Sequence, residues 1–152
     1  MLLYHGSKEK FEKLRPQQAQ AGEGVEVPKD ELQKAIYLTP NYKFAVACAA
    51  RPDGVSNIDD KNGKIEFEKP ETFNPEQDIY IYCVNSENVP PENLKPVKDN
   101  NGEIDKNQFV IINTDELLPD YVECKKAIEV EKYYELTNWK KETVQENSTK
   151  IR

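Results

Sequence analysis

The segment Tyr4-His5-Gly6-Ser7 holds the residues of this chain that are best suited to bind a ligand. His5 is the only histidine among the 152 residues, and it follows a short apolar run that predicts a strand. An imidazole donates or accepts a hydrogen bond, and a glycine lets the backbone come close to a bound molecule. A dinucleotide site uses both groups together with an aromatic face. The alternatives are a structural histidine and an ordinary turn or helix cap at Ser7.

Two later segments carry the other groups that such a site needs. Ala35 to Leu38 predicts a strand that ends at Thr39-Pro40-Asn41, and its Tyr37 offers either an aromatic face or a core side chain. Gln108 begins an apolar run that continues to Ile112 and predicts another strand. Its amide can hydrogen-bond a sugar hydroxyl without carrying charge.

In this order and context the three segments resemble the ADP-ribosyltransferase-like fold, in its diphtheria-toxin and poly(ADP-ribose)-polymerase branch. That branch is marked by a His-Gly-Ser or His-Gly-Thr segment and by an Ile-Tyr-Phe-Ala type strand before a helix. Its third mark is an Asn-Glu-Tyr type strand that carries a catalytic glutamate. The resemblance covers roughly residues 2–52 and 78–130.

The resemblance implies NAD as the substrate and gives the first residues their roles. His5 would hydrogen-bond the adenosine-side ribose, and the Gly6 backbone would hold the nicotinamide carboxamide with support from Ser7. Tyr37 would stack on the nicotinamide ring. The second aromatic of the family falls on Cys48 here, so we expect Tyr42 or Phe44 to replace it.

The resemblance also implies a catalytic set of Gln108, His5 and Tyr37, with Gln108 at the glutamate's position. Cleavage of the nicotinamide–ribose bond builds positive charge on the ribose, which a carboxylate stabilises and a neutral amide does not. Losing such a group typically slows a reaction by about 10²–10³-fold. A neutral hydrogen bond contributes only about 0.5–1.5 kcal/mol to binding, so binding should suffer far less.

Three nearby acidic residues could supply the missing charge or could simply be solvated surface groups. Glu103 and Asp105 lie just before the predicted strand, and Glu116 lies beyond it.

We therefore expect an NAD-binding ADP-ribosyltransferase-like protein with weak or altered mono-ADP-ribosyl transfer to a protein or nucleic-acid acceptor. The alternative is a pseudoenzyme on the same fold that binds a nucleotide or a protein. A third reading is an acidic interaction protein with no small-molecule site.

The length of the chain predicts one domain, over residues 1–138 with a polar tail over 139–152, and periodicity predicts only that it is rich in strands. The resemblance implies an α+β fold with two packed, mostly antiparallel sheets and few helices. The fold itself rests on the resemblance. The net charge of −7 argues against a general nucleic-acid surface. With no long apolar run, we expect a cytoplasmic protein that does not contact membranes.

The three cysteines have no metal-ligand spacing, so we expect buried thiols and no metal. Asn62-Gly63 and Asn101-Gly102 predict tight turns rather than calcium loops, because the final carboxylate of a calcium loop is missing.

The remaining elements are predicted from periodicity and turn residues. We expect a turn or short helix near Phe11, loops over 17–34 and 86–106, and a helix from Tyr42 to Ala50. Strands are expected at Leu2–Tyr4, Ile65–Glu68 and Asp78–Val84, with one long strand from Val122 to Leu136.

Overall fold

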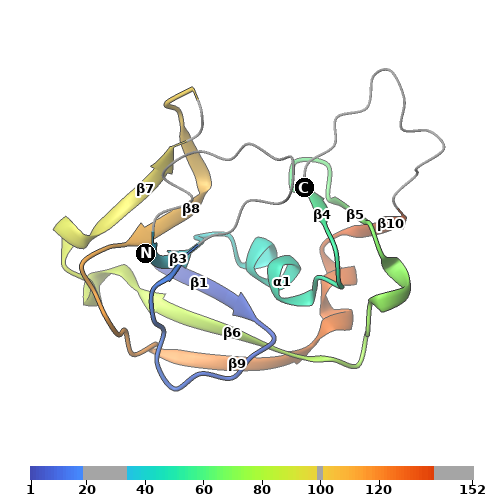
Figure 1. Cartoon of the computed structure of the whole chain (residues 1–152), viewed down its shortest axis with the longest axis horizontal. Helices are drawn as coiled ribbons and strands as arrows, with labels where there is room; N and C mark the ends of the chain where they lie inside the picture. Colours follow the sequence, from blue (N-terminus) through green and yellow to red (C-terminus); the bar gives the residue numbers. More distant parts are fainter. Residues whose placement is uncertain (19–33, 99–100, 139–152) are drawn as a thin grey trace.

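The described part of the chain folds into three small sheets and one α-helix, which lies near the centre of the molecule (Figure 1). This structure, a computed structural model, describes residues 1–18, 34–98 and 101–138. The expected α+β class, with few helices and mostly antiparallel sheets, is confirmed. The expectation of two sheets is wrong, because residues 56–67 and 135–138 form a third one. The loop predicted between the first two strands lies mostly outside the described residues, as does the tail.

The first sheet is antiparallel and has the order β1-β6-β9. Its strands are β1 (Leu2–Ser7), β6 (Asp78–Asn85) and β9 (Tyr121–Lys126). The middle strand, β6, is the most apolar of the three, and five of its eight residues are buried. β1 is longer than the predicted strand, because pairing with β6 extends through His5 and Gly6 to Ser7.

The second sheet has the order β2-β3-β8-β7 and is also antiparallel. It contains β2 (Gln17–Gln18), β3 (Lys34–Leu38), β7 (Leu94–Lys98) and β8 (Ile104–Ile111). A bridge joins it to the first sheet, in which Tyr4 and Thr39 exchange backbone hydrogen bonds of 2.7 and 2.8 Å.

The third sheet has the order β10-β5-β4 and includes a parallel pair. Its strands are β4 (Ser56–Asp59), β5 (Lys64–Phe67) and β10 (Glu135–Asn138). The predicted turn at Asn62-Gly63 joins β4 to β5, with Gly63 at a φ of +66° that favours glycine.

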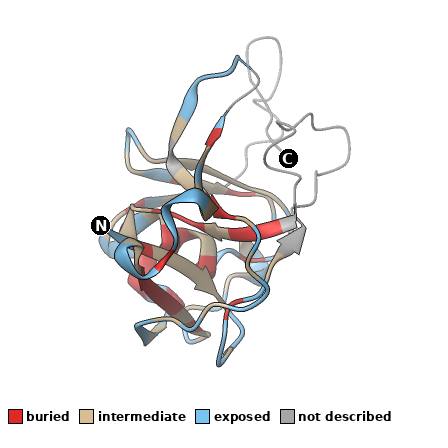
Figure 2. Ribbon diagram, turned by 90° about the vertical axis from the view of Figure 1, so that its left-hand side faces the viewer, coloured by how far each residue is buried: buried red, intermediate tan, exposed pale blue. Residues whose placement is uncertain are grey.

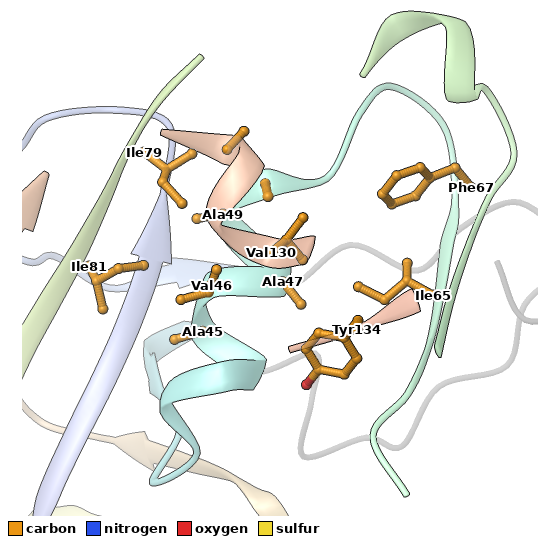
Figure 3. Packing of buried hydrophobic residues seen from close by; sticks show 12 residues of the cluster. Ala45, Val46, Ala47, Ala49, Ile65, Phe67, Ile79, Ile81, Val130 and Tyr134 are labelled. Carbon is orange, nitrogen blue, oxygen red and sulfur yellow. The ribbon is translucent and has the colours of Figure 1, made fainter. Parts of the chain in front are cut away.

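The helix α1 (Tyr42–Ala50) has the predicted bounds and begins at the Asn41 cap. The Asn41 side chain accepts a hydrogen bond from the Phe44 amide at 3.3 Å. Small residues let the helix pack closely on both sides. Figure 3 shows α1 between two groups of side chains. Ile79 and Ile81 of β6 lie on one side of the helix, and Ile65, Val130 and Tyr134 lie on the other.

These side chains form the central cluster, and a second cluster fills the space between the first two sheets. Figure 2 shows buried segments running through the interior with exposed loops outside them. The second cluster consists of Leu3, Leu14, Ile36, Leu38, Tyr82, Val84, Val89 and Ile111.

Two expectations along the C-terminal half are wrong. The predicted long strand from Val122 is broken after β9 by a 3₁₀ helix, Ala127–Lys132 (η5). Ala127, Val130 and Tyr134 are buried at helical spacing, whereas Ile128 is 43% exposed. Residues 86–106, expected as a loop, contain β7, the start of β8 and the 3₁₀ helices Ser86–Asn88 and Pro91–Asn93. A further 3₁₀ helix covers Pro70–Thr72.

The cysteines are all unbridged, but they are not all buried. Cys83 is buried in β6 and Cys48 is half-buried on α1, whereas Cys124 is exposed on the edge strand β9. The described ranges contain no group of ligating side chains that could hold a metal ion. No helix within them combines the length and apolar character needed to cross a membrane.

Candidate functional site

Strand register brings the three predicted site segments side by side. Tyr4 of β1 bridges Thr39, and Leu38 of β3 pairs with Phe109 of β8. Continuing that register by one residue, beyond the last pair of β3 and β8, sets Gln108 next to Thr39. With strands about 4.7–4.9 Å apart, the backbones of Tyr4 and Gln108 are about 10 Å apart across β3.

The His5 ring is oriented by the backbone of the neighbouring strand. Its Nδ1 lies 3.0 Å from the carbonyl oxygen of Tyr37, which can only accept, so Nδ1 carries the proton. Burial lowers the pKa of His5 below its usual 6.5, although the hydrogen bond to Tyr37 acts in the other direction. At neutral pH the ring is therefore uncharged, and Nε2 is its acceptor.

A depression of about 220 Å³ opens beside His5 where β3 changes partners. β3 pairs with β2 at Ala35 and bridges to β1 at Thr39, and the intervening backbone of β3 borders the hollow. Its lining consists of His5, Phe11, Lys13, Leu14, Arg15, Pro16, Ala35, Ile36 and Tyr37. The structure thus brings His5 and Tyr37 to one site together with two cationic residues that the sequence did not single out.

The cations at this depression share one carboxylate. Lys13 Nζ lies 3.1 Å from Glu116, and Arg15 lies 3.9 Å from the same side chain. Both cations hold the pKa of Glu116 below its usual value, so it is ionised at neutral pH. Of the three acidic residues considered for catalysis, Glu116 is therefore the one associated with the lining of this hollow.

Gln108 is not among the residues that line the depression. It shares a face of β8 with Val110, which packs with Ala35 and Val97 in a third cluster. The His5 ring instead lies 6.0 Å from that of Tyr82, in the second cluster. The backbones of the predicted site residues are therefore neighbours, but their side chains are not together. The His5 ring lies beside the second cluster, and Gln108 lies on the face of β8 that packs in the third cluster.

The Gln108 side chain is held by a neighbouring carboxylate. Its Nε2 donates to Oδ2 of Asp105 at 2.9 Å. Asp105 lies within β8 rather than on the preceding loop where it was expected, whereas Glu103 is exposed just before the strand.

Gly6 and Ser7 line a second depression of about 330 Å³, at the C-terminal end of α1. Cys48, Lys8 and Arg51 also line it, and Lys8 Nζ donates to the Arg51 carbonyl. Burial, followed by the nearby Arg51 charge, lowers the pKa of Lys8.

Local contacts explain the residue types in this part of β1. A Cβ at Gly6 would lie 2.0 Å from the Ala45 carbonyl oxygen, so α1 packing requires glycine there. Ser7 Oγ accepts from the Glu9 amide at 3.0 Å and stabilises the turn after β1.

Tyr42 and Phe44, which were expected to replace the family's second aromatic, lie at the start of α1. Tyr42 packs edge-on against Tyr4, with ring centroids 5.2 Å apart, and its hydroxyl donates to Glu123. Phe44 is half-buried on the same helix. At Cys48, burial raises the thiol pKa to about 11, so this residue is uncharged at neutral pH.

Tyr82 supports the wall of the first depression, a role that sequence reasoning missed. Its buried hydroxyl donates to the Glu9 carbonyl at 2.8 Å and accepts from the Phe11 amide at 2.5 Å. These bonds hold the segment after β1 against β6. The available signal was a tyrosine inside the most apolar predicted strand, where a hydroxyl requires a partner.

Comparisons with protein-family models, with curated proteins and with solved structures find no match to this chain.

Proposed function

We propose that the chain is an ADP-ribosyltransferase-like protein that binds NAD beside His5, with weak or altered transfer of ADP-ribose. The observation that carries this proposal is the hydrogen bond from His5 Nδ1 to the Tyr37 carbonyl at the 220 Å³ depression. It fixes the tautomer and orients the ring, which are the conditions for a directional contact with a ribose hydroxyl.

Charge at the depression supports a phosphate-bearing ligand. Lys13 and Arg15 stand at the lining, and the pyrophosphate of NAD could replace Glu116 as their anionic partner. Phe11 adds an aromatic face at the same hollow. The size of the depression fits part of a dinucleotide, with the rest extending along the surface.

Chemistry at this site would lack a carboxylate where the family has its glutamate. Transfer requires the nicotinamide–ribose bond to break as an acceptor attacks the ribose carbon, with positive charge developing on the sugar. Gln108 can hydrogen-bond a hydroxyl but does not stabilise that charge. Binding with slow transfer is therefore the function we infer.

The alternative is a nucleotide-binding or protein-binding module without catalysis. The hydrogen bond between Gln108 and Asp105 favours it, because that contact engages the side chain that would have to meet the ribose.

Calorimetric titration with NAD tests the binding proposal. We expect saturable binding that weakens at least tenfold in Lys13→Ala, whereas Lys95→Ala, a lysine on β7 outside the depression, should bind as the wild type does. His5→Ala should also weaken binding. Folded wild-type protein that shows no binding at about 1 mM NAD would refute the proposal.

Gln108→Glu then separates the two readings. Release of nicotinamide from NAD by this variant, well above the wild-type rate, would indicate a site aligned for chemistry. Unchanged NAD binding without any release would favour the non-catalytic module.

A further inference from the structure

We propose that β9 is a self-complementary edge through which two copies of this chain form one continuous sheet. β9 is the edge strand of the order β1-β6-β9, and within the described part of the chain it pairs with β6 alone. Figure 1 shows β9 next to β6, on the side away from β1.

Backbone geometry identifies the groups that β9 presents at this edge. The Ala127 amide donates to the Gln77 carbonyl at 2.8 Å, one step beyond the pairing of Lys126 with Asp78. Hydrogen-bonding direction alternates along an antiparallel strand. The backbone groups of Val122, Cys124 and Lys126 therefore point away from β6, towards a further strand.

Apolar side chains gather around this edge. Tyr121 is 47% exposed and Val122 is 40% exposed, both on β9 itself. Leu118, 69% exposed, precedes the strand, and Ile128, 43% exposed, follows it. A second strand placed here would cover part of this apolar surface.

The lysines that usually discourage edge pairing are engaged within the sheet. Lys126 Nζ lies 2.6 Å from Asp78 on β6, and Lys125 Nζ lies 4.0 Å from Glu123. The edge therefore does not present unopposed positive charge.

The order of charged residues along β9 makes a second copy of the same strand a suitable partner. In an antiparallel pair with its two-fold axis at Cys124, the outward backbone groups of Val122 meet those of Lys126 from the other copy. Glu123 then faces Lys125 of the second copy, on both sides of the axis. These are non-hydrogen-bonded positions, where opposed Cα atoms are only about 4.5 Å apart.

The two nearest registers that keep the outward backbone groups facing each other bring like charges together. A shift of two residues in one direction places Glu123 against Glu123, and a shift in the other direction places Lys125 against Lys125. Like charges directly opposite each other destabilise a strand pair. The strand thus favours one symmetric register.

Charge-reversal variants of the full chain test this interface by sedimentation velocity between about 1 μM and 1 mM protein. Wild type should move from monomer to dimer, whereas Lys125→Glu and Glu123→Lys should each remain monomeric. An equimolar mixture of the two variants should dimerise, because every facing pair is then opposite in charge. Lys95→Glu, the same change on the edge strand β7, should dimerise as the wild type does.

Disulfide formation between the two copies of Cys124 tests the proposed register independently. The exposed thiol of Cys124 would lie on the two-fold axis, at a Cα separation of about 5.5 Å that a disulfide can span. Diamide, which accepts the two hydrogens lost by two thiols, should link wild-type chains into a dimer that a reductant reverses. Cys124→Ser should dimerise without becoming linked.

Two results would overturn the proposal: a monomeric wild type throughout this range, or dimerisation of Lys125→Glu that equals that of the wild type. Glu123→Lys also removes the acceptor of the Tyr42 hydroxyl, so its melting curve is recorded first. Lys125→Glu leaves that bond in place and decides the question by itself if the other variant does not fold.

Discussion

Replacing Gly6 with alanine should strongly destabilise the protein through the packing of α1. The added Cβ would meet the Ala45 carbonyl oxygen at 2.0 Å, whereas ordinary contacts begin at about 3.4 Å, so these two atoms must move apart by about 1.4 Å. The helix is buried on both sides by the central cluster and cannot move freely.

Overpacking a core typically costs about 1–3 kcal/mol, and the upper end applies here because the obstructing atom belongs to the backbone. At about 2–4 °C per kcal/mol, Gly6→Ala should lower the melting temperature by about 6–12 °C. Far-ultraviolet circular dichroism measures both the melting temperature and the free energy of unfolding in urea.

Gly102→Ala is the matched control, because nothing lies within 4 Å of its added Cβ. Its φ of +80° leaves only backbone strain, which costs about 1–2 kcal/mol. If Gly6→Ala were as stable as Gly102→Ala, the close packing of α1 on β1 would be wrong.

Two further changes probe His5 and the α1 cap. Burial lowers the pKa of His5 below 6.5, so the unfolded chain binds the proton more readily, and His5 should reduce stability as pH falls below about 6.5. The difference in unfolding free energy between wild type and His5→Gln should therefore shrink from pH 8 to pH 5, and a constant difference, or an NMR pKa above 6.5, would contradict this. Asn41→Ala should cost about 1–2 kcal/mol, because the side chain caps Phe44 and also donates to Asp60 at 3.0 Å. Asn41→Ser keeps the cap and should fall between alanine and wild type in urea unfolding, whereas equal losses would show that the cap contributes nothing.

The sequence correctly predicted the elements whose bounds depend on residues close by in the chain. The bounds of α1 follow from Asn41 at its start and from Arg51-Pro52 at its end, both readable in the chain. The turn at Asn62-Gly63 is equally local, since glycine adopts the positive φ at little cost.

Elements that depend on distant partners were predicted less well. The end of β1 is set by β6, and the break after β9 follows from the packing of Ala127 and Val130 in the central cluster. A period of two from Val122 onwards could not show that the backbone turns there. The third sheet joins β5 to β10 in parallel across a long stretch of chain, which no short window contains.

The same difference decides which residues of the candidate site could be predicted from the sequence. Sequence order was enough to single out His5 and Tyr37, which line one depression. The contribution of Lys13 and Arg15 was not readable, because it depends on how the segment after β1 returns against β3. The contact between Gln108 and Asp105 depends on where β8 begins, which the prediction placed too late.

The pairing of β1 with β6 has a consequence for synthesis on the ribosome. Leu2 pairs with Asn85 and Ser7 with Tyr80, so the first strand is made long before its partner. At the usual synthesis rate of 5–20 residues per second, roughly 4–16 s pass between the completion of β1 and the completion of β6. During that interval the apolar side chains of β1 are open to chaperones, and the nascent chain is most vulnerable before the middle strand leaves the exit tunnel.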